Sequence, residues 1–110
     1  MDEKRSLLDE VVAAINERYQ GEFTEGDRVI VDDLLKRLLA NPKQCKIARS
    51  SDPKIFKDSQ FPKFFEDTAE EAYAESMDRY AKIFKDRAKY NAIMNAVCSA
   101  LYRVCRNAEQ

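Results

Sequence analysis

The sequence predicts an all-α protein: a compact bundle of about five helices without a sheet. Apolar residues recur every three or four positions along almost the whole chain, which is the period of an amphipathic helix. No stretch of useful length alternates apolar and polar residues with the period of two that a half-buried strand shows. Helix start signals, such as an Asn-Pro or Asp-Pro pair, separate the apolar stripes.

The first two helices are expected over about 4–20 and 24–41. Gly21 suits the C-terminal cap of the first helix. Thr24 is the expected N-cap of the second, with Asp27 in a first turn where the helix dipole favours acidic side chains. The inward stripes are Leu7, Leu8, Val11, Val12, Ile15 and Tyr19 in the first helix, and Ile30, Leu34, Leu35, Leu38 and Leu39 in the second.

A short third helix is expected over 42–51, because Asn41 can cap it and Pro42 suits its first position. The Asp52-Pro53 pair repeats this signal and begins the longest element. We expect a break near Ser59-Gln60, because Pro62 removes a backbone donor and clashes with the preceding turn. The inward face of this element is Phe61, Phe64, Phe65, Ala69, Ala72, Tyr73, Met77, Tyr80, Ile83 and Phe84.

Asp86 is the expected cap of the final helix. Its inward residues are Tyr90, Ile93, Met94, Val97, Leu101, Val104 and Cys105. With 110 residues, 45% of them hydrophobic and 35% charged, the chain has the size and composition of one globular domain, 1–110.

Three cysteines, Cys45, Cys98 and Cys105, are expected to be free thiols that pack as small buried hydrophobes in a reducing cytoplasm. Cys98 and Cys105 lie seven residues apart, which is about 10 Å of rise on one helix, too far for a disulfide. Without a histidine they also make no zinc site. No apolar run approaches the ~20 residues that span a bilayer, so we expect neither secretion nor membrane insertion.

The charges form blocks along the chain, although the net charge of -1 gives no overall attraction to nucleic acid. Residues 1–33 and 64–80 are acidic, whereas 34–63 carry eight basic residues against two acidic ones. Attraction between oppositely charged helices would explain these blocks. The alternative is a basic surface for a partner, and the candidate DNA contacts are Lys43, Lys46, Arg49, Lys54 and Lys57.

No residue pattern points to catalysis, a cofactor or a metal. Histidine, the commonest general base and metal ligand, does not occur. Gly21 and Gly26 have the spacing of a phosphate loop, but Asp27-Arg28 follow where Lys and Ser or Thr are needed. The acidic run in 64–80 is typical of a solvated helix face. Phe56, Phe61, Phe64 and Phe65 favour a core, with base stacking or the docking of another domain as alternatives.

One ordered set of short motifs resembles a known family. It begins with Asn16-Glu17-Arg18-Tyr19, then Phe23-Thr24 and Asp27. It continues with Leu38 to Asn41, Ile55-Phe56-Lys57, Phe61 to Phe65, Met77-Asp78-Arg79, Ile83-Phe84 and Leu101-Tyr102-Arg103. In this order and spacing the set is similar to the C-terminal helical region of the R subunit of type I restriction enzymes, across nearly the whole chain.

This resemblance implies a non-catalytic C-terminal piece of a larger bacterial or archaeal cytoplasmic protein. The parent would be an endonuclease that translocates DNA with ATP and Mg²⁺, whereas the matching segment itself implies no cofactor. The implied partners are the modification and specificity subunits of the methyltransferase core. We expect the docking surface to include Asn16, Arg18, Tyr19 and Phe23. Direct DNA contact is the alternative, and self-association of the isolated piece is a third possibility.

Overall fold

The computed structural model describes residues 6–107, which form six helical segments and no strand, so the predicted all-α bundle is confirmed. The first helix, α1, spans Leu7–Arg18, and the part of its predicted range before residue 6 lies outside the described residues. The other segments are α2 (Glu25–Leu39), α3 (Pro42–Ser50), α4 (Pro53–Ile55) continued by the π-helical turn η1 (Phe56–Gln60) and α5 (Phe61–Glu75), α6 (Met77–Lys85) and α7 (Arg87–Asn107).

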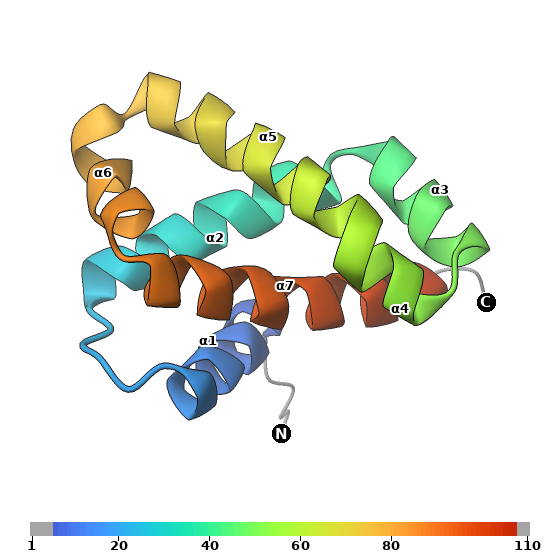
Figure 1. Cartoon of the computed structure of the whole chain (residues 1–110), viewed down its shortest axis with the longest axis horizontal. Helices are drawn as coiled ribbons and strands as arrows, with labels where there is room; N and C mark the ends of the chain where they lie inside the picture. Colours follow the sequence, from blue (N-terminus) through green and yellow to red (C-terminus); the bar gives the residue numbers. More distant parts are fainter. Residues whose placement is uncertain (1–5, 108–110) are drawn as a thin grey trace.

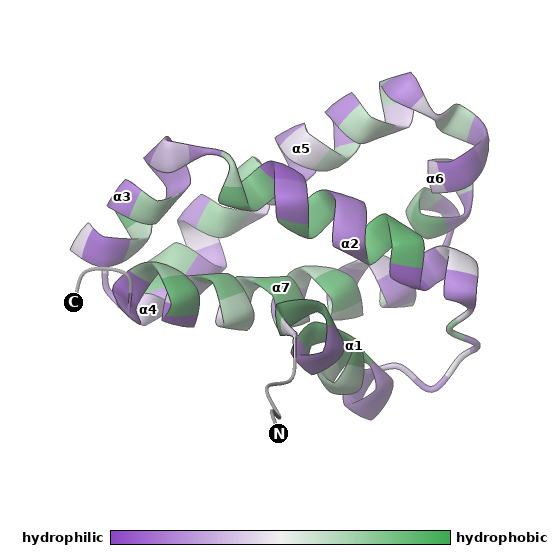
Figure 2. Ribbon diagram, turned by 180° about the vertical axis from the view of Figure 1, so that it is seen from behind, coloured by the Kyte–Doolittle hydropathy of each residue, from purple (hydrophilic) through white to green (hydrophobic). Residues whose placement is uncertain are grey.

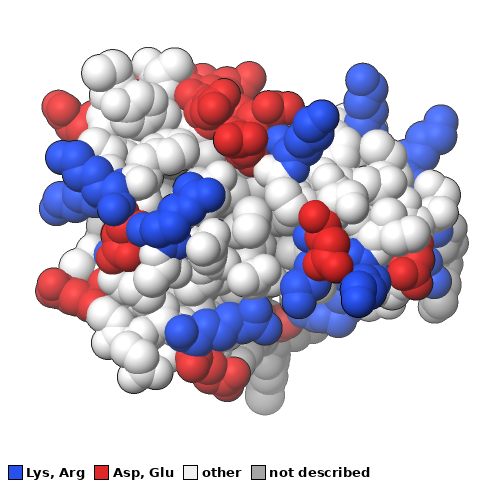
Figure 3. All heavy atoms as spheres, viewed as in Figure 1, with Lys and Arg blue, Asp and Glu red and all other residues white. Residues whose placement is uncertain are grey.

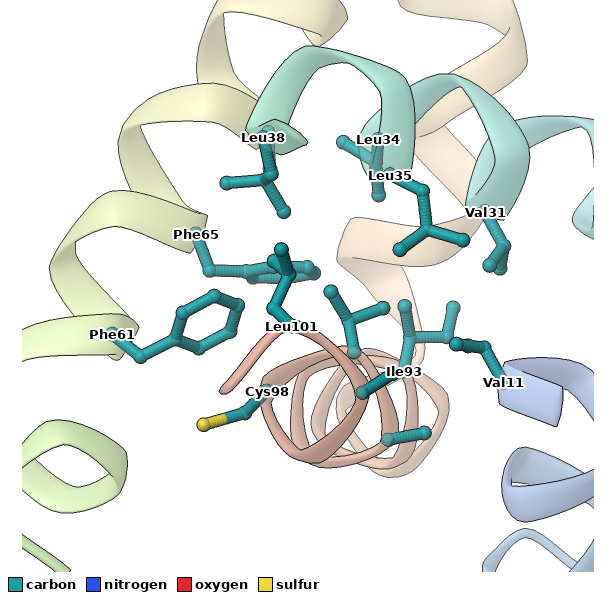
Figure 4. Close-up of a cluster of buried hydrophobic side chains, with 14 of the residues drawn as sticks. Val11, Val31, Leu34, Leu35, Leu38, Phe61, Phe65, Ile93, Cys98 and Leu101 are labelled. Carbon is teal, nitrogen blue, oxygen red and sulfur yellow. The ribbon is translucent and has the colours of Figure 1, made fainter. Parts of the chain in front are cut away.

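The last helix, α7, is the axis of the fold. It runs along the long dimension of the molecule, with α1 on one side and α2 and α5 on the other (Figure 1). Ile93, Val97 and Leu101 of α7 are fully buried. They meet Val11 of α1 and the apolar stripe of α2 in one continuous core (Figure 4).

The apolar periodicity places most side chains correctly. Hydrophobic colour concentrates on the faces of α1, α2 and α7 that face one another (Figure 2). The prediction of an inward position is wrong for two residues. Leu39, at the end of α2, is 41% exposed, and Met77, at the start of α6, is 56% exposed. Both stand at helix ends, where the chain leaves the packed layer. Val31 of α2 is fully buried, although the predicted inward stripe of this helix does not include it.

The expected break at Ser59-Gln60 is replaced by a wider turn. Over Phe56–Gln60 the helix adopts π geometry, and the backbone N–H of Phe61 donates to the carbonyl of Phe56 five residues earlier. Pro62 would clash with the carbonyl of Asp58 in a regular α-helix. The π turn accommodates the proline without ending the helix.

The long element instead breaks at Ser76, inside the stretch that the apolar periodicity predicts to be helical. Ser76 has φ -147° and ψ 73°, so α5 ends there and α6 turns back (Figure 1). This turn brings Tyr80 under α2, where its side chain is buried and its hydroxyl donates to the carboxylate of Asp33. The break at Ser76 is therefore accompanied by a contact between two residues that are 47 positions apart in the sequence. No glycine or proline near Ser76 indicates the break in the sequence.

Candidate functional site

The α1–α2 connection ends in a capping box at the start of α2. Thr24 Oγ1 accepts a hydrogen bond from the backbone N–H of Asp27 at 3.2 Å. Asp27 Oδ2 accepts one from the backbone N–H of Thr24 at 2.9 Å. The predicted N-cap at Thr24 is thus confirmed, and its partner is the acidic residue of the first turn.

Asp27 also forms a buried ion pair with α7. Lys89 Nζ lies 2.7 Å from Asp27 Oδ2, and the side chains of Asp27 and Lys89 are only 4% and 11% exposed. Burial alone would raise the pKa of Asp27, but the hydrogen bonds from Lys89 and Thr24 outweigh it and hold that pKa below its usual value. The pair fixes the first turn of α2 to the first turn of α7.

Tyr19, which follows α1, makes a second contact with the start of α7. Its hydroxyl donates to Asp86 Oδ2 at 2.5 Å, while Asp86 Oδ1 accepts from the backbone N–H of Lys89 at 3.0 Å and caps α7 as predicted. The hydrogen bond to Asp86 raises the pKa of Tyr19 to about 12, and the same bond lowers the pKa of Asp86. Lys89 Nζ lies 5.5 Å from the centre of the Tyr19 ring.

Gly21 makes room for this ring. A Cβ at Gly21 would lie 2.4 Å from the Tyr19 hydroxyl oxygen, so any side chain there would displace Tyr19. The predicted role of Gly21 as helix cap is wrong, because Tyr19 itself is the C-cap residue of α1, in extended geometry, and Gly21 does not have a positive φ.

We call Tyr19, Asp27, Asp86 and Lys89 the N-terminal junction. Of the predicted docking residues, Tyr19 is half-buried and belongs to it, and Phe23 is half-buried against the core. The other two, Asn16 and Arg18, are exposed on the last turn of α1.

Sequence reasoning missed the pairings Asp27–Lys89 and Tyr19–Asp86, which span 62 and 67 residues. One signal was available. Lys89 follows Asp86 by three residues and precedes Ile93 by four, so it lies on the apolar stripe of the last helix. A lysine at such a position needs a buried partner.

The candidate DNA-contacting residues gather at the other end of the molecule. Lys43 and Lys46 project from α3, and Lys54 and Lys57 from α4 and η1; all four are exposed. Within residues 6–107 none of these lysines forms an ion pair. We call these four lysines the basic end. Figure 3 shows basic side chains over α3 and α4 and acidic ones over α5.

Arg49, the fifth candidate, lies differently. It is half-buried, and its carbonyl oxygen accepts a 3.4 Å hydrogen bond from Arg106 Nη1 of α7. Arg49 also takes part in a further interaction and is therefore not grouped with the four lysines.

Elsewhere the charge blocks do attract one another. Arg37 Nη2 of α2 lies 2.7 Å from Glu75 Oε1 of α5 and its Nε lies 3.0 Å from Asp33. The hydrogen bond from Arg37 lowers the pKa of Glu75. Arg28 pairs with Asp9 at 2.5 Å and joins α2 to α1, within the first acidic block. Intramolecular complementarity therefore explains much of the pattern, but it does not extend to the basic end.

The expectation of three free thiols is wrong. Cys45 of α3 and Cys105 of α7 form a disulfide across 60 residues, with their Cα atoms 5.0 Å apart. The two cysteines meet because α3 packs along the C-terminal half of α7 (Figure 1). Cys98 is free and buried, as the helical spacing required, and burial raises its pKa to about 11.

Beside Cys98 a shallow hollow of about 230 Å³ opens between α4, η1 and α7. Phe56 and Tyr102 line it, with ring centres 5.5 Å apart. Phe56 is nevertheless buried, as are Phe61 and Phe65, so these phenylalanines form core as expected and do not present rings for base stacking.

Within residues 6–107 no three His, Cys, Asp or Glu side chains converge in a way that could hold a metal ion. No helix of the described chain is long and apolar enough to cross a membrane. No family model matches the sequence, and neither curated proteins nor solved structures include a match.

Proposed function

We propose that the chain is a non-catalytic assembly domain of the kind that ends the R subunit of a cytoplasmic type I restriction enzyme. It would dock the ATP-dependent DNA-translocating motor onto the methyltransferase core of modification and specificity subunits. One observation supports this proposal: the N-terminal junction immobilises the end of α1, where Asn16 and Arg18 face outward.

A fixed surface favours docking on general grounds. Association costs free energy for every side chain and loop that it orders, so an ordered surface binds with less loss. Arg18 presents a planar guanidinium with several donors, and arginine is enriched in protein interfaces. Asn16 lies two residues earlier, on another side of the same exposed turn, and offers both a donor and an acceptor.

The test is co-elution in size exclusion with the cognate methyltransferase core, without DNA. We expect the wild-type chain to co-elute and the Asn16→Ala/Arg18→Glu variant to elute alone. Arg79→Glu is the matched control, because it makes the same charge change on another exposed position, in α6. Loss of co-elution in both variants, or separate elution of the wild type, would contradict docking through this surface.

The second candidate function is contact with DNA through the basic end, and its four exposed lysines, which form no ion pair within residues 6–107, favour it. Lysine ammonium groups neutralise phosphates without reading bases, so binding would be independent of sequence and steeply dependent on salt. Replacement of Lys43, Lys46, Lys54 and Lys57 by Glu should abolish duplex binding and leave co-elution with the core intact. Light scattering across a concentration series would reveal self-association, which would displace both candidates if it occluded these surfaces.

A further inference from the structure

The basic end consists of two parts that different elements hold in place. Lys43 and Lys46 belong to α3, whereas Lys54 and Lys57 belong to the helix that starts at Pro53. Phe56 anchors this second helix in the core, and α5 continues it. The relative placement of the four lysines therefore depends on how firmly α3 is attached.

The apolar attachment of α3 is small. Of its nine residues only Gln44 and Ala48 are fully buried. Gln44 Nε2 donates to the carbonyl of Leu38 at 2.5 Å, but its Oε1 has no partner among the described residues. A buried acceptor without a partner opposes folding. A nine-residue helix is also marginal on its own.

The last turns of α7 supply the remaining attachment. Tyr102 Oη donates to the carbonyl of Ser51 at 3.0 Å, and Arg106 donates to that of Arg49. The third link is the Cys45–Cys105 disulfide, the covalent one. It crosses the interface between α3 and α7 in the middle of α3.

We infer that the Cys45–Cys105 disulfide is a redox switch for the basic end: its oxidised form aligns the lysines of α3 with Lys54 and Lys57 for a duplex phosphate backbone, and its reduction releases α3. This inference rests on the second candidate function. Cys45 is half-buried and Cys105 fully buried, so an external thiol reaches the bond from the Cys45 side.

A low-molecular-weight dithiol would reduce the Cys45–Cys105 bond in two exchange steps. One thiolate attacks Cys45 Sγ, the bond between the two sulfur atoms breaks, and Cys105 leaves as a thiolate that takes up a proton. The second thiol of the reductant displaces Cys45, which is also protonated, and the reductant ends as a cyclic disulfide. Disulfides in reducing cytosol are usually transient or redox-sensing. The thiol form would then be the resting state, and a low-molecular-weight disulfide would assemble the basic end by the reverse exchange, in which it is itself reduced to thiol.

The test measures binding of a short fluorescein-labelled duplex by anisotropy between about 50 and 200 mM salt, for the oxidised and the reduced chain. Four phosphate contacts predict a slope of log K against log salt near -4, and loss of the two from α3 predicts about -2 after reduction. Cys45→Ser/Cys105→Ser should show the shallow slope in both conditions. Cys98→Ser should keep the redox response.

The outcomes separate the inference from the function on which it rests. No duplex binding in either state would overturn DNA contact itself. Binding with equal slopes in both states would leave DNA contact standing and overturn the switch. Tighter binding of a poly-glutamate peptide than of the duplex would assign the surface to an acidic protein and overturn the nucleic-acid partner.

Amide hydrogen exchange distinguishes the release of α3 from global unfolding, which would also weaken DNA binding. Reduction should accelerate exchange in 42–51 and leave the centres of α2 and α7 protected. Loss of protection throughout α7 would mean global unfolding, and would overturn a switch confined to α3.

Discussion

The N-terminal junction and the basic end use similar side chains in opposite ways. At the junction, Lys89 is buried against Asp27, and Tyr19 donates to Asp86, so each polar group is bonded within the fold. At the basic end, exposed lysines have no carboxylate partner within residues 6–107. The junction pairs its charges within the fold, whereas the basic end leaves its charges to solvent or to a partner.

The two regions also differ in what joins them to α7. The junction is attached through two pairs of side chains that are 62 and 67 residues apart, of which Asp27–Lys89 is buried and Tyr19–Asp86 is half-buried. At the basic end, the links from α7 to α3 and its C-cap residue include a disulfide and two hydrogen bonds to backbone carbonyls, around a helix with little buried apolar surface. We therefore expect the first attachment to respond to pH and the second to redox conditions.

The largest effect is expected from the disulfide. Closing a loop of 60 residues restricts the unfolded chain, which corresponds to about 4 kcal/mol in the chain-entropy treatment. Adding a reductant should therefore lower the free energy of unfolding of the wild type by up to about that amount. Urea unfolding with and without reductant measures it. The Cys45→Ser/Cys105→Ser variant is the control, and a response of that variant to reductant would refute the assignment.

Breaking the buried ion pair should come next. Lys89→Ala leaves the Asp27 carboxylate buried without its cation, and such a loss costs about 3 kcal/mol or more. Urea denaturation measures the change. Lys36→Ala removes a pair with Asp32 at 3.1 Å that is largely exposed, and should cost less than about 0.5 kcal/mol. The double change Asp27→Asn/Lys89→Met should recover most of the loss. Equal costs for Lys89→Ala and Lys36→Ala would remove the distinction between the buried pair and the exposed pair.

Much of the fold follows from local signals. The apolar period, the Thr24 capping box, Pro42 at the start of α3 and Asp86 before α7 each depend on neighbours within four residues. Local signals of this kind can be predicted from a sequence.

The missed features depend on distant contacts. The break at Ser76 accompanies the Tyr80–Asp33 hydrogen bond. The disulfide depends on α3 folding back onto α7. Cys45 lies 60 residues before Cys105, and nothing near either cysteine indicates its partner. The charged residues of the candidate surfaces can be identified from the sequence, whereas the pairing of those charges is a property of the fold.

The junction should titrate at both ends of the pH scale. The pKa of Tyr19 is raised to about 12 from the ordinary value of 10.0 by the bond to Asp86, so its stabilising effect is complete below pH 10 and is lost as pH rises towards 12. The pKa values of Asp27 and Asp86 are lowered, so their contributions are present above their ordinary value of 3.8 and are lost as pH falls through the lower folded-state values.

Tyrosine ¹³Cζ chemical shifts in a pH titration measure the alkaline limb. Tyr19→Phe identifies the resonance, and Asp86→Asn should move the titration of Tyr19 from about 12 back towards 10.0. An unchanged midpoint in Asp86→Asn would show that the hydrogen bond is not the cause.

The smallest effect on stability is expected at the basic end. Lys46→Glu reverses a charge that is exposed and has no partner within residues 6–107, so the free energy of unfolding should change by less than about 0.5 kcal/mol. Lys89→Glu makes the same chemical change at the junction, where it would place two carboxylates together in a buried site and cost several times more. Thermal unfolding of this matched pair measures the contrast directly. If Lys46→Glu proved as destabilising as Lys89→Glu, the lysines of α3 would be part of the fold, and the basic end would no longer be a surface left available for a partner.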